Sequence, residues 1–133
     1  MLNKTILIID DHKKFREILR IYIENEFKDL KIKEAGTGEE GVQVAIRERP
    51  NISLVDVRLP GIDGIETARQ IRECVPGCEI ITMSMFQQSS FQELVDQKAM
   101  VFVNKSKIDS ELIPLLYKFL NGIKSKKGVH DEI

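Results

Sequence analysis

Five short hydrophobic runs recur along the chain, at residues 5–9, 31–35, 52–55, 79–83 and 101–103. Runs that are hydrophobic on both faces are typical of strands buried in a parallel sheet. The stretches between them, and residues 108–123 after the last, space their hydrophobic residues three or four apart among charged ones, which predicts amphipathic helices. The stretch at 87–97 is the least regular of these. The alternation predicts an α/β fold, a five-stranded, doubly wound parallel sheet with helices on both faces.

Two prolines bear on where the predicted helices end or begin. Pro50 closes the second helix, which is expected to run to residue 49. Pro114 lies inside the hydrophobic stripe of the last helix. That helix therefore either begins late or is bent at the proline, and the pattern alone leaves both possibilities open.

The composition is that of an ordinary globular domain. The 133 residues are 42% hydrophobic and 31% charged, with a formal net charge of −1. This balance gives no reason to expect binding to nucleic acid, which normally needs a clustered basic excess. No hydrophobic run approaches the roughly 20 residues of a membrane span, so we expect no membrane association and, by default, a cytoplasmic location. We expect one domain at residues 1–123, followed by a polar tail or the start of a linker at 124–133.

The stretch around Asp56 is the most informative part of the sequence. Asp56 follows the third hydrophobic run, and the chain then turns through Pro60, Gly61 and Gly64. Proline and glycine there end the strand just after the aspartate. Ligands of open parallel sheets bind outside the carboxyl ends of the strands, so Asp56 is a candidate for chemistry.

Four of the five predicted strands end in a residue able to do chemistry. These are Asp10 with Asp11, Asp56, Ser84 and Lys105. Strand ends of one polarity meet along one edge of a parallel sheet, so we expect these side chains to share one cleft. The second strand ends without such a residue and is expected to contribute nothing.

Three carboxylates in one cleft repel one another, so either one holds a proton or a cation lies among them. Oxygen ligands without a cysteine cluster favour a hard ion, and an open site with few carboxylates suits Mg²⁺ bound together with a phosphate. A metal, an ammonium, a hydroxyl and one accessible carboxylate are the groups needed to receive a phosphoryl group.

These motifs resemble the receiver domain of two-component response regulators, over residues 3–123. The resemblance rests on Asp10, Asp11, Asp56, Pro60, Gly64, Ser84, Phe102 and Lys105. The residues of these motifs are most similar to those of receivers that precede LuxR-type helix-turn-helix domains. The resemblance implies a (βα)5, flavodoxin-like fold.

For the acidic residues, the resemblance implies a phosphoacceptor and its metal site. Asp56 would accept the phosphoryl group from a sensor histidine kinase. Asp11 would bind Mg²⁺ directly and Asp10 through water, with Asp56 and the backbone carbonyl of Arg58 completing the protein ligands. The chain would not be a turnover enzyme, although it would assist its own phosphorylation and dephosphorylation.

For the remaining site residues, the resemblance implies a switch. Ser84 would donate to the phosphoryl oxygens, Lys105 would pair with them, and Phe102 would change rotamer. The surface formed by the fourth helix, fifth strand and last helix would then change its partner preference. The output would be transcription through a domain or partner absent from this chain. Homodimerisation on phosphorylation remains open.

Other interpretations compete with this one. Gly36, Gly38 and Gly41 form a G-x-G-x-x-G pattern typical of dinucleotide sites, but Thr37 and Glu40 also fit a helix-capping box, which we prefer. A phosphohydrolase of the haloacid dehalogenase kind would use similar groups, although its Asp-x-Asp motif is missing. A receiver-like interaction module without phosphorylation is a further alternative. We expect His12 to be exposed in the first helical turn and not to bind metal.

Overall fold

The first strand, which lies inside the sheet, shows why the chain folds as it does. In the computed structural model, which describes residues 4–85 and 100–121, β1 (Lys4–Ile9) places Ile6 and Ile8 on one face and Leu7 and Ile9 on the other. All four side chains are fully buried. The run that is hydrophobic on both faces is therefore a strand covered on both sides, as predicted.

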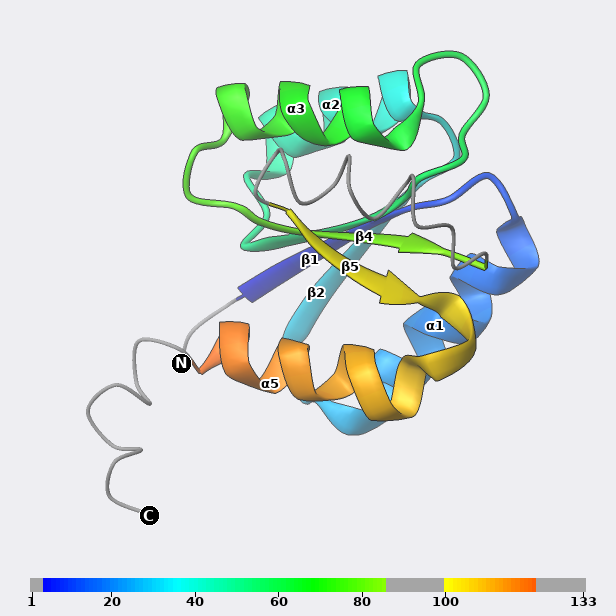
Figure 1. The fold of residues 1–133 in the computed structure, drawn as a ribbon. Helices are drawn as coiled ribbons and strands as arrows, with labels where there is room; N and C mark the ends of the chain where they lie inside the picture. Colours follow the sequence, from blue (N-terminus) through cyan, green and yellow to red (C-terminus); the bar gives the residue numbers. More distant parts are fainter. Residues whose placement is uncertain (1–3, 86–99, 122–133) are drawn as a thin grey trace.

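The sheet has five parallel strands in the order β2-β1-β3-β4-β5. The other strands are β2 (Leu30–Ala35), β3 (Ile52–Asp56), β4 (Glu79–Ser84) and β5 (Val101–Asn104). The described helices are α1 (Lys13–Glu26), α2 (Gly38–Glu48), α3 (Gly64–Cys74) and α5 (Ile113–Leu120). Helices α2 and α3 cover one face of the sheet, and α1 and α5 cover the other (Figure 1). The predicted fold class is confirmed, while the helix expected at 87–97 lies outside the described residues.

The last helix begins late. A 3-10 turn (Lys105–Lys107) and a π-helical turn (Ile108–Leu112) lead from β5 into α5. Pro114 lies in the first turn of the regular helix, a position that proline tolerates. This settles the alternative that the sequence pattern had left open.

The glycine-rich turn before α2 is a helix cap. The backbone N–H of Glu40 donates to Thr37 Oγ1 at 3.0 Å, and Glu40 Oε1 accepts from the N–H of Gly36 at 2.8 Å. The return bond thus goes to the residue before the N-cap, one position earlier than in a standard capping box. A side chain at Gly41 would lie 2.9 Å from Ile9 Cγ1, so this glycine is needed for close packing of α2 on β1. These contacts support the capping interpretation over a dinucleotide site.

Candidate functional site

Asp56 is the last residue of β3 and lies at the carboxyl edge of the sheet. Its side chain is 5% exposed, and its Oδ1 accepts a hydrogen bond from the backbone N–H of Arg58 at 3.3 Å. The N–H of Gly64 donates to Val57 O at 2.9 Å, which brings the first turn of α3 back against the strand exit. The turn predicted after the strand therefore holds the carboxylate of Asp56 through the Arg58 N–H and the following backbone through the Gly64 N–H.

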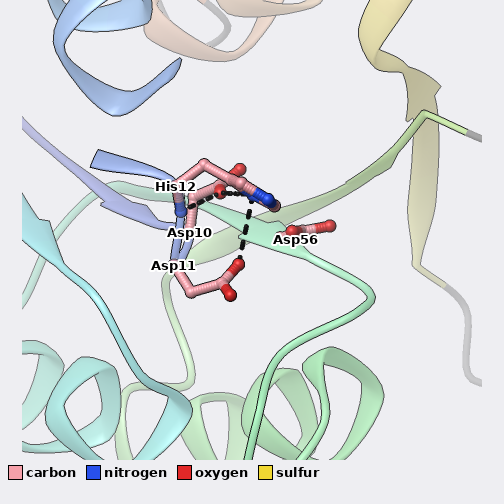
Figure 2. A group of neighbouring side chains, drawn as sticks. All are labelled: Asp10, Asp11, His12 and Asp56. Atoms are coloured by element: carbon pink, nitrogen blue, oxygen red, sulfur yellow. Dashed lines mark hydrogen bonds and ion pairs between the residues drawn. The ribbon is translucent and has the colours of Figure 1, made fainter. Parts of the chain in front are cut away.

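The turn after β1 brings Asp10 and Asp11 toward Asp56 (Figure 2). Asp10 is fully buried, and its Oδ1 accepts the backbone N–H of His12 at 2.9 Å. Asp11 keeps 36% of its side chain exposed. Ligand atoms of Asp10, Asp11, His12 and Asp56 all lie within 4.8 Å of one another. The structure thus assembles the acidic cluster that the strand-end argument predicted.

His12 was expected to be exposed, and its side chain is 69% exposed. It is the N-cap of α1 and not a residue of its first turn. The contacts of its ring could not be predicted from the sequence. Nδ1 lies 3.2 Å from Asp10 Oδ1 and 3.2 Å from Asp11 Oδ1, so the imidazole bridges the two carboxylates.

Lys105 supplies a positive charge inside the cluster. Its Nζ lies 2.5 Å from Asp10 Oδ2 and 3.4 Å from Asp56 Oδ2, with only 4% of its side chain exposed. Asp10 Oδ2 is buried and has no hydrogen-bond donor with good geometry, so the close ion pair is its compensation. Phe15 of α1 covers the ammonium, with its ring centroid 4.3 Å from Nζ. The Lys105 ammonium is therefore a cation that the protein itself supplies among the carboxylates.

Burial and neighbouring charged groups both shift the pKa of Asp56. Burial is the largest effect and raises its pKa above the ordinary value. Lys105 and the Arg58 N–H lower the pKa, while Asp10 raises it further. Three carboxyl groups, those of Asp10, Asp11 and Asp56, face the one ammonium of Lys105, so the cluster holds more negative charge than Lys105 offsets when they are ionised. Such a site has unused capacity for a second cation.

This balance predicts a pH-dependent stability difference for Asp56→Asn. Because the pKa of Asp56 is raised on folding, its contribution to stability is present at low pH and is lost as pH rises through the folded-state pKa. We expect Asp56→Asn to have a higher unfolding midpoint than wild type at pH 7, and the difference to shrink toward pH 4. Thermal unfolding across that range, without divalent ions, measures it. A variant that is less stable than wild type at pH 7 would contradict the prediction.

Ser84 and Phe102 come from neighbouring strands near the same edge. Ser84 ends β4, is 1% exposed and lies opposite Asn104 in the register with β5. Asn104 Oδ1 accepts from the backbone N–H of Ser106 at 2.8 Å and so caps the turn that begins with Lys105. Phe102 is half-buried and packs on the core on the α2 and α3 side of the sheet.

A contact that sequence reasoning missed holds the Asp10 peptide. Arg16 of α1 donates from Nη1 to the backbone carbonyl of Asp10 at 2.6 Å and from Nε to Glu34 Oε1 at 3.0 Å. Glu34 belongs to β2, the strand expected to contribute nothing. The strand-end pattern could not indicate this contact, because Arg16 lies in the first turn of a helix and Glu34 is the last residue but one of its strand.

An open depression of about 490 Å³ adjoins the cluster. Asp11 and the β3–α3 loop line it, with Arg58, Pro60 and Asp63 among the loop residues. A group larger than water can therefore approach the exposed carboxylate of Asp11.

The fold and this edge of carboxylates with a buried lysine define a receiver-type domain. Residues 6–116 match the family model described as "Response regulator receiver domain", and the chain belongs to this family. A solved two-component response regulator of the LuxR family from Aurantimonas sp. SI85-9A1 superposes with a TM-score of 0.81 at 29% identity, covering 91% of this chain and 87% of that one. The expected similarity to LuxR-type receivers is confirmed.

Curated relatives are named as transcriptional regulators. The transcriptional activator protein ExaE of Pseudomonas putida is 30% identical over 88% of this chain and 55% of its own length. The transcriptional regulatory protein LiaR of Bacillus subtilis is 31% identical over 80% of this chain and 51% of its own length. The chain thus spans about half the length of these two relatives. Among the described residues, no helix combines the length and hydrophobicity of a membrane span.

Proposed function

We propose that this receiver domain accepts a phosphoryl group on Asp56 from a phosphohistidine of a sensor kinase. The observation that carries the proposal is the Lys105 ammonium shared by Asp10 and Asp56 beside the more exposed Asp11. A carboxylate at the end of a strand, next to a buried cation and an open depression, suits the attack on an incoming phosphorus atom.

The residues present fit a Mg²⁺ ion. Their donors are carboxylate oxygens, the ligands this hard ion prefers, and the three carboxyl groups outnumber the Lys105 ammonium beside them. Asp11, Asp56 and the carbonyl of Arg58 are proposed as direct ligands. Asp10 is proposed to act through water, since one of its oxygens accepts from His12 and the other contacts Lys105. Mg²⁺ held there would neutralise charge on the phosphoryl oxygens.

In the proposed transfer, a carboxylate oxygen of Asp56 forms a bond to phosphorus while the bond from phosphorus to the donor imidazole nitrogen breaks. The bonding electron pair stays on that nitrogen. Lys105 already lies 3.4 Å from Asp56 Oδ2, so it can follow the new charge with a small movement. Ser84 would donate its hydroxyl to a phosphoryl oxygen.

The added charge would then bias a switch. Drawing Ser84 inward would leave space for the ring of Phe102, which is only half-buried and so has room to reorient. The surface of β5 and α5, with the predicted helix at 87–97, would change its partner preference. The output is proposed to be transcriptional, as the names of the relatives suggest for them. The proposed receiver domain comprises residues 1–123.

Intact-mass analysis after incubation with acetyl phosphate tests the proposal. We expect a gain of one phosphoryl group with Mg²⁺, none with EDTA, and none for Asp56→Asn. Asp63→Asn is the matched control, because Asp63 lines the same depression but caps α3, a role that asparagine also fills. It should label like wild type. Labelling that persists in Asp56→Asn would refute the assignment, and steady turnover of a phosphate monoester would favour a hydrolase instead.

A further inference from the structure

A network of charged side chains connects the edge strand β2 to the turn that carries Asp10 and Asp11. Glu34 of β2 accepts from Arg16 Nε at 3.0 Å and from Arg20 Nε at 2.7 Å. Arg16 extends this network through its Nη1, which donates to the backbone carbonyl of Asp10 at 2.6 Å. Arg16 is 16% and Glu34 24% exposed, so the contact is well shielded from solvent.

This network of side chains fixes the orientation of one peptide group. The carbonyl of Asp10 belongs to the peptide that joins Asp10 to Asp11, so its direction sets where the Asp11 backbone begins. Other constraints also act on the turn. The N–H of Asp10 donates to Ala35 O at 3.1 Å, the side chain of Asp10 accepts from the N–H of His12, and the exposed His12 ring lies 3.2 Å from the carboxylates of Asp10 and Asp11. Arg16 adds the charged hydrogen bond, and charged donors make the stronger bonds of this kind.

We propose that Arg16, oriented by Glu34, is a positioning residue that sets the affinity of the Asp10–Asp11 turn for Mg²⁺. The proposal rests on the proposed function and deepens it. Arg16 touches neither the metal ligands' carboxylates nor the phosphoryl site in any described contact. It acts by holding the peptide that carries Asp11, as outer-shell partners do in other metal sites.

Electrostatics and positioning predict opposite results for Arg16→Met. Arg16 is a cation close to a cation site, so its charge alone opposes Mg²⁺ binding, and removing it would tighten binding. If the guanidinium orients the turn, removing it weakens binding despite the lost repulsion. Arg16→Lys separates the two effects further. It keeps the charge but replaces the planar fork, which here serves two acceptors at once, with a single point donor.

The experiment is a Mg²⁺ titration of the full chain, followed by NMR of backbone amides, for wild type, Arg16→Met, Arg16→Lys and Lys14→Met. Lys14 is an exposed cation on the same helix, so Lys14→Met removes the same charge without the contact to Asp10. We expect binding to weaken about tenfold for Arg16→Met and by a smaller factor for Arg16→Lys. Lys14→Met should bind at least as tightly as wild type.

A second readout separates positioning from general damage. The rate of labelling by acetyl phosphate should need more Mg²⁺ for half-saturation in Arg16→Met, yet reach the wild-type rate at saturating Mg²⁺. If Arg16→Met does not fold, the Mg²⁺ affinity of Arg16→Lys, expected to be weaker than that of wild type, tests the inference. Unchanged or tighter Mg²⁺ binding by a folded Arg16 variant would overturn this inference alone. A wild-type chain that binds no Mg²⁺ would overturn the proposed function and this inference with it.

Discussion

Replacing Lys105 by methionine is expected to destabilise the chain by about 3 kcal/mol at pH 7 in the absence of divalent ions, because breaking a buried ion pair leaves an uncompensated charge. Methionine keeps an unbranched side chain of similar length but removes the ammonium, and with it the cation–π contact to the ring of Phe15. Asp10, which is 0% exposed, and Asp56, at 5%, then face each other without a cation. Both the desolvation of the carboxylates and their mutual repulsion remain.

The loss should depend on pH and on metal. Lys105 lowers the pKa of Asp56, so its removal raises that pKa further above the ordinary value. A carboxyl with a raised folded-state pKa favours folding below that pKa and opposes it above, so the deficit of Lys105→Met should shrink as pH falls. Added Mg²⁺ should recover part of the loss at pH 7, since it binds only the folded cluster.

Urea unfolding at pH 5 and pH 7, with and without Mg²⁺, measures these effects. Lys107→Met is the matched control. Lys107 lies 4.0 Å from Glu111 with 51% of its side chain exposed, and exposed pairs contribute about 0–1 kcal/mol. If Lys105→Met were no less stable than Lys107→Met at pH 7, the ion pairs of Lys105 would not stabilise the fold.

The sequence was sufficient to predict which residues meet at the site. Asp10, Asp56 and Lys105 each follow a hydrophobic run, and parallel strands bring such positions to one edge whatever their separation in the chain. Hydrophobic periodicity also predicted the strands within a residue or two, because burial on both faces leaves a continuous hydrophobic run. These inferences needed only the polarity of the strands, not the conformation of any side chain.

The sequence was insufficient where the answer depends on side-chain direction. It left open whether a proton or a cation relieves the carboxylates, and the Lys105 ammonium proves to lie against two of them. It assigned no role to Arg16 or to Glu34. These side chains meet because α1 packs beside β2, and the 2.6 Å contact to the Asp10 carbonyl depends on one arginine rotamer. No periodicity in the sequence reports a rotamer.

Gly64→Ala is the second substitution for which we expect a large loss, about 3 kcal/mol of unfolding free energy. A Cβ at this position would lie 2.6 Å from Val57 Cα and 2.8 Å from the carbonyl carbon of Asp56. These are backbone atoms, so no rotamer change relieves the overlap.

The matched control is Gly77→Ala, because a Cβ at Gly77 would meet no atom within 4 Å. We expect its unfolding free energy to stay within about 0.5 kcal/mol of wild type. Equal stability of the two variants by urea unfolding would contradict the steric argument. The substitution also bears on the site, because relief requires α3 or the Asp56 peptide to move. We therefore expect Gly64→Ala, even under conditions where it is folded, to accept a phosphoryl group more slowly than Gly77→Ala.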